Sequence, residues 1–418
     1  MMILKQELIK IIKNPVIPLL LLFFLVVNFL IVISHSYFKE EMSVLTDLVD
    51  VYGHEINEEM ETRIHDDYEE IVSWVNEIAP NQKGTYNHPS ELLTDISILK
   101  ENPLNHEDYQ QLLRFTTIEQ YIRDIEEIDT VYKELNLSDY GKSLIDMYGL
   151  SGSAAEEVRI ESQKLEERAN ELLDMGEHKH LFFNGKLYEM HSLLFKNIGR
   201  ALIFELMIIV VLITAALTNY EFEHRTSQVV FATKRGRKLV FDKLGASILG
   251  SLIAMMILIA ITLTTFFITY DYSGLWDVPI SSYFNAEGKL PFITWWNLSF
   301  LEYLMLFAVL IILIQLLFSG ISFLLSILMK NTYLVFFAFA ILLGIGFLLP
   351  GYMPRDTRFL FLVNYNPSGL ILNPHEWLMG NGPFTMGPYY ELITLGLWSL
   401  VLVVLTVGSI LRFKSKSL

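Results

Sequence analysis

Histidines and carboxylates are the side chains of this sequence with the greatest capacity for chemistry. His178, His180 and His191 carry imidazoles that could ligate a metal ion, although a solvated polar turn is the favoured interpretation. Residues 39–199 hold so many carboxylates that nothing singles out two of them for acid–base catalysis. The chain has no cysteine, no Gly-x-x-x-x-Gly-Lys-[Ser/Thr] phosphate loop, no Gly-x-Ser-x-Gly and no His-Glu-x-x-His pattern. We therefore expect no catalytic residue, no metal site and no ATP hydrolysis by the chain itself.

Residues 219–243 are distinguished by the order of their side chains. The segment begins acidic, has a short apolar centre around Val229 and Val230, and ends in basic residues between Lys234 and Lys238. A short helix here would hold its acidic residues at the positive end of its dipole, with Gly236 as its stop. Its apolar centre could dock in a groove on a soluble protein, and an interfacial helix on anionic lipid fits the same composition.

Long apolar runs flank these side chains. Of the 418 residues, 52% are apolar and 19% are charged, whereas soluble proteins average roughly 45–50% and about 25%. Five runs lack Asp, Glu, Lys and Arg entirely, and a sixth, residues 201–220, contains only Glu205. Each run is long enough to cross the roughly 30 Å hydrocarbon layer as a helix. A purely soluble enzyme is therefore excluded.

The charge of the chain is divided between two parts. Residues 39–199 carry a net charge of −21 and the remainder carries +5. An acidic block of this length indicates one separate, water-exposed domain, and its sign argues against nucleic acid as a partner. Apolar spacing within it predicts helices at 55–78, 107–135 and 154–175, the last opening with a capping box of Ser153 and Glu156. A small extended piece is expected near 180–188.

The loops between the apolar runs alternate in charge. With six spans, every basic loop falls on one side and every acidic loop on the other. Because basic residues mark the cytoplasmic side, both termini are expected in the cytoplasm and residues 39–199 outside the cell. The spans hold few polar groups, of which Arg200, Glu205 and Gln315 line a pathway or join helices. We expect Glu205 to pair with Arg200 or with a backbone group.

The 219–243 segment resembles the loop after span two in the membrane permeases of ABC exporters of the type-2 class. In that family the loop contains, in this order, an acidic residue, a Gly-Thr pair, an apolar pair, a Ser/Thr-Pro step, an Arg and a Lys. The matching positions, extended by one neighbouring arginine, are Glu221, Glu223, Arg225, Thr226, Val229, Val230, Thr233, Arg235, Arg237 and Lys243. The sequence departs from the pattern because Arg225 replaces the usual glycine and no proline follows Thr233.

The apolar runs and the charge pattern predict an all-α polytopic membrane protein with a mainly helical extracytoplasmic domain inserted between helices 1 and 2. The resemblance covers roughly residues 1–38 and 200–418 of it, and it implies the elbow helix, the coupling loop and the outer hairpin. The expected layout is an amphipathic elbow helix at 1–13, spans at 14–38, 200–220, 244–270, 303–329, 331–350 and 391–412, an acidic domain at 39–199, a cytoplasmic coupling loop at 221–243, and an outer re-entrant hairpin at 351–390. That hairpin is broken by Pro354, Pro367 and Pro374 and would act as an outer gate.

The family's mechanism implies several partners for this chain. A second permease copy or a paralogue would complete a pathway in the lipid bilayer, and a cytoplasmic ATPase subunit would bind the coupling loop. ATP and magnesium would sit on that ATPase, and no cofactor would bind this chain directly. The cargo would be an antimicrobial peptide, a drug, a lipid or an ion. The Ile- and Lys-rich composition suggests a bacterial plasma membrane.

Two other interpretations remain open at the level of sequence. In the first, an ABC ATPase moves the acidic domain to regulate an envelope enzyme or a kinase, and nothing is transported. In the second, the chain is a membrane scaffold or receptor that has no ATPase partner.

Overall fold

Six long apolar helices dominate the fold. The computed structural model describes residues 2–79, 85–99, 102–183, 189–232, 236, 239–287 and 290–415. Within these residues, six helices are long and apolar enough to cross a membrane: Val16–Ser34, Ser192–Glu223, Leu239–Thr269, Phe300–Met329, Thr332–Tyr352 and Tyr390–Leu411. They coincide with the six predicted runs, so the prediction of a mainly helical, multi-pass membrane protein is confirmed.

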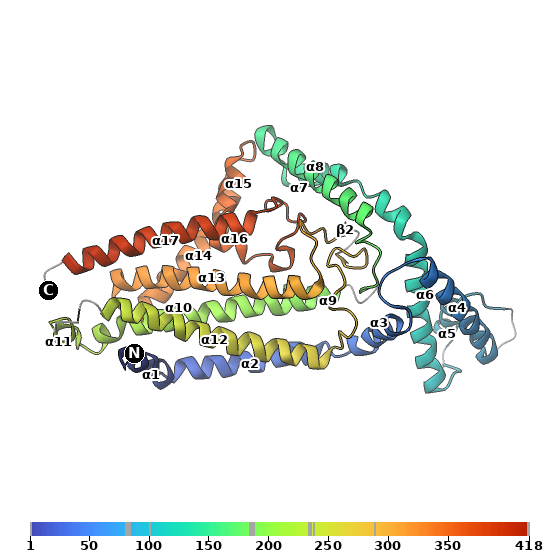
Figure 1. Cartoon of the computed structure of the whole chain (residues 1–418), viewed down its shortest axis with the longest axis horizontal. Coiled ribbons are helices and arrows are strands. Elements are labelled where there is room, and N and C mark those ends of the chain that lie inside the picture. Colours follow the sequence, from blue (N-terminus) through green and yellow to red (C-terminus); the bar gives the residue numbers. More distant parts are fainter. Residues whose placement is uncertain are drawn as a thin grey trace.

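The second of these helices lies at the centre of the bundle. It consists of a π-helical turn, Ser192–Ile198, followed by α10 (Gly199–Glu223). Within its most apolar stretch 72% of the residues are buried, against 22% for α2 (Val16–Ser34). α10 packs against α12 (Leu239–Thr269), α13 (Phe300–Met329), α14 (Thr332–Leu348), α2 and the N-terminal α1 (Met2–Lys13), while α17 (Tyr390–Ser415) packs on α13. Both termini and the short helix α11 (Ser227–Ala232) lie at one end of the bundle (Figure 1).

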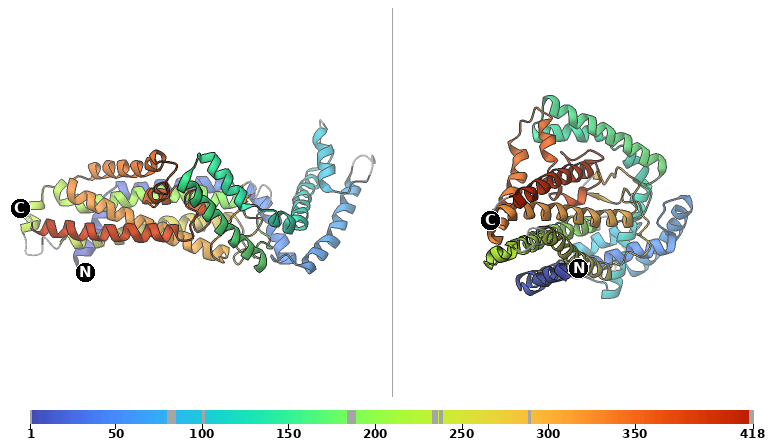
Figure 2. Two further views of the ribbon diagram at one scale, coloured as in Figure 1. Left: turned by 90° about the horizontal axis from the view of Figure 1, so that it is seen from above. Right: turned by 60° about the vertical axis from the view of Figure 1, so that its left-hand side comes forward.

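The 39–199 segment lies at the opposite end of the bundle (Figure 1). Its helices are α3 (Phe38–Tyr52), α4 (Glu58–Ile78), α5 (Pro89–Ile98), α6 (His106–Lys133), α7 (Leu137–Tyr148), α8 (Gly152–Met175) and the short α9 (Glu189–His191). The predicted helices at 55–78, 107–135 and 154–175 correspond to α4, α6 and α8. Asn57 and Asn105 cap α4 and α6 by accepting a backbone N–H three residues ahead. Figure 2 shows α4, α5 and part of α6 projecting as an arm beyond the bundle.

The apolar residues of the 39–199 segment are divided among three cores. Those of the arm form a small cluster around Val75, Leu92 and Leu112. α3, the first part of α4 with Met60 and Ile64, and part of α6 belong to the main core, which continues into the membrane bundle. α7 and α8 form a third cluster that includes Ile293 and Leu360 from outside the segment. Burial therefore ties this segment to the loops that follow α12 and α14.

Those two loops are compact and contain little regular structure. The loop after α12 holds a two-stranded antiparallel hairpin, β1 (Ala286–Glu287) and β2 (Leu290–Pro291). The 351–390 segment contains α15 (Phe359–Asn364), α16 (Pro367–Leu370) and a 3-10 turn at Pro374–Glu376. Another 3-10 turn, Leu349–Tyr352, joins α14 to this segment.

Two local predictions for the 39–199 segment have different outcomes. The capping box at Ser153 is wrong, because α8 takes Ser151 as its N-cap and the Ser153 hydroxyl donates to the Asp356 carbonyl at 3.1 Å. The extended piece is reduced to an isolated bridge between Glu55 and His180, while residues 184–188 lie outside the described chain.

Candidate functional site

The 221–243 loop leaves α10 through a turn that favours glycine. Arg225 has a φ of 57°, in the left-handed region. The Thr226 N–H donates to the Glu221 carbonyl at 2.9 Å, and the Arg225 N–H donates to the Phe222 carbonyl at 3.2 Å. This pair of bonds defines a Schellman helix end, in which glycine usually occupies the position of Arg225. Arg225 therefore has the backbone expected of the glycine that it replaces in the resembled motif.

Three buried charges and the half-buried Lys10 join the helices at the base of this loop. The Lys10 ammonium of α1 contacts the carboxylates of Glu7 at 2.6 Å and Glu221 at 2.9 Å. The other oxygen of Glu221 accepts from Lys243, whose ammonium also donates to the Leu217 carbonyl at 2.5 Å. Glu7, Glu221 and Lys243 are each at most 4% exposed. We call Glu7, Lys10, Glu221 and Lys243 the charge brace, because they join α1, α10 and α12 where the loop begins and ends.

The remaining residues predicted for the loop lie further out. Glu223, Arg225 and Thr226 are exposed, and Val229 on α11 is 73% exposed. Glu223 also accepts the Thr332 N–H at 2.7 Å, at the start of α14. Val230 is half-buried. The predicted residues Thr233, Arg235 and Arg237 lie outside the described chain.

Polar groups inside the bundle join helices to one another. The Asn28 amide of α2 donates to the Glu205 carboxyl at 2.8 Å and to the Thr262 hydroxyl of α12 at 3.1 Å. The partner of Glu205 is therefore Asn28, and Arg200 instead donates to the Leu372 carbonyl at 3.0 Å. Arg200 and Glu205 do not pair because they are five positions apart on α10 and therefore lie on different faces of the helix. Such bonds between helices stabilise a membrane bundle.

Gln315 also joins two helices. Its side-chain amide on α13 donates to the Ile203 carbonyl of α10 at 2.8 Å. The Thr214 hydroxyl of α10 and the Ser319 hydroxyl of α13 also form a hydrogen bond, at 2.8 Å, closer to the C-terminal ends of the same two helices. The geometry fits the helix-joining interpretation of Gln315.

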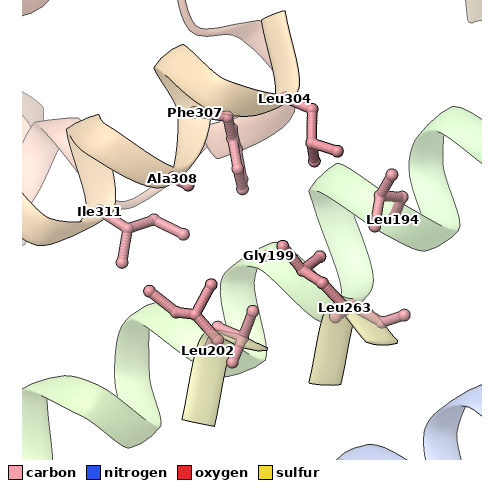
Figure 3. A pocket seen from close by; sticks show the side chains of 10 residues that line it. Leu194, Gly199, Leu202, Leu263, Leu304, Phe307, Ala308 and Ile311 are labelled. Carbon is pink, nitrogen blue, oxygen red and sulfur yellow. The ribbon is translucent and has the colours of Figure 1, made fainter. Parts of the chain in front are cut away.

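The space between α10, α12 and α13 is apolar and nearly filled. Figure 3 shows Leu202, Leu304, Phe307 and Ile311 converging there from α10 and α13. The cavity measures about 10 Å³, which is at the limit for one water molecule. A Cβ on Gly199 would lie 2.5 Å from the Phe307 ring, so glycine permits this close contact. This part of a single copy therefore offers no aqueous passage.

The three predicted gate prolines occupy different environments. Pro354 is exposed in a turn, whereas Pro367 and Pro374 are buried at the starts of α16 and the following 3-10 turn. The Ser368 hydroxyl donates to the Leu343 carbonyl of α14 at 3.1 Å, and α16 also contacts α17. Broken helix is thus covered by neighbouring protein, as it must be if it lies at membrane depth.

The 39–199 segment is hydrogen-bonded to both loops at its end of the bundle. Arg168 of α8 is buried and donates to the Thr294 carbonyl at 3.0 Å and to the Asn297 side chain at 2.6 Å. The turn before α8 is held by the 351–390 segment, because the Ser153 N–H donates to the Asp356 carbonyl at 2.9 Å. Sequence reasoning missed these contacts, since no local pattern identifies a partner more than a hundred residues away.

The histidines considered as metal ligands do not converge. His178 Nε2 lies 3.1 Å from Asp129 Oδ1, His180 stacks on His54, and His191 stacks on Phe292. Among the described residues no group of three or more His, Cys, Asp or Glu side chains could hold a metal ion.

No family model, no curated protein and no solved structure matches this chain significantly. The site is therefore interpreted from its own geometry.

Proposed function

We propose that this chain is the permease subunit of an ATP-driven ABC exporter of the type-2 class, acting with a second permease and a separate ATPase. The observation that carries the proposal is the charge brace beneath an exposed loop helix. α11 presents Val229 to solvent, while Glu221 and Lys243 fix the two ends of the loop to α1 and to each other. A partner that moved α11 would therefore move α1, α10 and α12 together.

The position of α10 supports this mechanical role. It is the most enclosed of the six apolar helices and contacts most of the others. Because packed helices shift between discrete arrangements, a displacement of α10 would repack the bundle as a unit. ATP and magnesium on the ATPase would supply the difference in binding free energy between two such states.

The closed interior favours a pathway between two permease copies over one within a single copy. The space between α10, α12 and α13 is too small for a cargo. The cargo class proposed is a peptide, drug, lipid or ion. The basic charge near α1, α11 and the C-terminus supports cytoplasmic termini in a bacterial plasma membrane, with the 39–199 segment outside.

Photo-crosslinking from position 229 tests the proposal. A benzophenone amino acid would replace Val229 in the full chain, expressed in its native cells, and cross-linked proteins would be identified by mass spectrometry. We expect a protein that contains a phosphate-binding loop, whose ATPase activity rises when it is reconstituted with the chain. The matched control is position 51, where Val51 is 54% exposed at the opposite end of the bundle. Cross-links at 229 only to lipid or to proteins without such a loop would support a scaffold or receptor.

A second candidate function is favoured by the bonds between the 39–199 segment and the two loops. If the loops move with the spans, Arg168 and Ser153 would carry that movement into the segment, as a mechanotransmission protein requires. Because the chain has no cysteine, Ser153→Cys with Asp356→Cys can be joined by a short thiol cross-linker. If the flux of a cargo in proteoliposomes survives the cross-link, the result supports export in which the 39–199 segment stays fixed to the 351–390 segment. ATP turnover without flux of any cargo class supports mechanotransmission.

A further inference from the structure

A cavity of about 240 Å³ lies between α8 and the 351–390 segment. Glu157 and Glu161, one turn apart on α8, contribute carboxylates to its wall. Phe361, Tyr365 and Phe384 contribute aromatic rings from the other side. Arg358 also lines the cavity and pairs with Glu157, so Glu161 and the aromatic rings form the part of the wall that is suited to a cation with an apolar body.

The carboxylates retain unused capacity to accept hydrogen bonds. Glu161 Oε1 accepts from Lys164 at 2.7 Å, but Glu161 Oε2 is buried without a hydrogen-bond partner among the described residues. Glu157 Oε2 pairs with Arg358 at 2.9 Å and its other oxygen remains available. A buried carboxylate oxygen without a donor is costly, so a ligand N–H in this cavity would remove that cost.

The aromatic rings of the cavity pack against one another and lie near the carboxylates of α8. The Phe361 and Phe384 rings pack with centroids 5.7 Å apart, and Phe384 also contacts Tyr148. Burial raises the pKa of the Tyr365 phenol, and the Glu161 and Glu157 carboxylates raise it further. Arg358 and Lys164 offset part of this negative charge, so the Glu161 oxygen without a donor is the group that would attract a positive charge into the space between the rings and α8.

We propose that this cavity binds an organic cation, namely a guanidinium or primary ammonium group on a short apolar stem. The group must donate N–H bonds, because Glu161 Oε2 lacks a donor, and it must tolerate ring faces beside it. Pockets for drug-sized molecules measure about 300–1,000 Å³, so 240 Å³ admits a smaller group. An arginine or lysine side chain of a peptide and a free alkylamine share this chemistry. The site does not depend on an ATPase or on transport.

Calorimetric titration of the purified full chain in nanodiscs tests this assignment. The probe is n-butylguanidinium, and n-butylurea is its uncharged counterpart of nearly the same shape. Glu161→Gln removes one of the two carboxylate charges in the cavity wall. Glu156→Gln removes the same charge from the same helix outside the cavity, where Glu156 is exposed and pairs with Arg159. Phe384→Leu tests the aromatic side independently of charge.

We expect saturable binding of n-butylguanidinium, with n-butylurea weaker by about tenfold or more, because a charge-assisted hydrogen bond is lost. Glu161→Gln should weaken binding by about tenfold and Phe384→Leu by about threefold, while Glu156→Gln changes it by less than about twofold. Absence of saturable binding, equal binding of n-butylurea, or equal losses in the two Glu→Gln variants would overturn the proposal. Competition by a capped arginine tripeptide assigns the site to peptides, and failure to compete assigns it to free amines.

Discussion

Removing one member of the buried pair Glu221 and Lys243 should destabilise the bundle more than removing both. The Lys243 ammonium is held by Glu221 and by the Leu217 and Thr218 carbonyls, and Lys243 is 2% exposed. In Lys243→Met, one oxygen of Glu221 loses its donor while the other keeps Lys10. Breaking a buried ion pair costs about 3–5 kcal/mol, whereas replacing the whole pair by neutral groups is often nearly neutral. We expect a loss of about 3 kcal/mol for Lys243→Met, at the lower end because Lys10 remains.

A double-mutant cycle measures the pairing directly. Glu221→Gln, Lys243→Met and the double variant would be unfolded with sodium dodecyl sulfate in mixed micelles, with tryptophan fluorescence as the signal. The double variant should lose about 2 kcal/mol less than the sum of the single variants, because the coupling is removed only once. Lys13→Met, at an exposed lysine on α1, serves as the control and should change stability by less than about 0.5 kcal/mol. Additive losses, or a neutral Lys243→Met, would show that the two residues do not act as a pair and would remove the basis of the charge brace.

Three further perturbations follow from single contacts. Arg225→Gly should raise the free energy of unfolding by about 1 kcal/mol, because glycine adopts the left-handed backbone at a φ of 57° without strain. The same titration with sodium dodecyl sulfate measures this free energy, and a decrease would contradict the prediction. Glu205→Gln should preserve the bond from Asn28, whereas Glu205→Leu should cost about 1–3 kcal/mol by leaving the Asn28 amide without that acceptor; equal effects would argue against the bond. Burial lowers the pKa of the His178 imidazole even though Asp129 opposes the shift. The unfolded chain therefore binds more protons below about pH 6.5, so stability should fall on acidification, and His178→Gln should reduce that slope in thermal unfolding between pH 5 and 8.

The membrane helices could be predicted closely from sequence, while their partners could not. A run such as Val16–Ser34 is a one-dimensional signal, because length and apolarity alone define it. Glu221 and Lys243 were identified as loop residues, but Glu221 also pairs with Lys10, which lies 211 positions away in the sequence. Glu7 and Lys10 were missed for the same reason. The only sequence signal for them is their spacing of three on the amphipathic α1.

The 39–199 segment shows a different limit of sequence analysis. The spacing of apolar residues located α4, α6 and α8 correctly, because it reports that one face of each helix is buried. It does not report what covers that face. For α8 the cover includes Ile293 and Leu360, which lie outside the segment. Length and charge therefore suggested a separate domain where the structure has a shared core.

Both candidate functions depend on a connection between the two ends of the bundle, and one continuous helix provides it. The span Ser192–Glu223 has 32 residues, which corresponds to roughly 48 Å at 1.5 Å per residue. At one end Glu221 belongs to the charge brace, and at the other Arg200 bonds the Leu372 carbonyl within the 351–390 segment. His191, immediately before the span, contacts the His375 carbonyl at 3.1 Å. A shift imposed at α11 would thus reach the 351–390 segment through a single rigid element. Export additionally requires a second copy to complete a pathway, whereas mechanotransmission requires only that the 39–199 segment follow that shift.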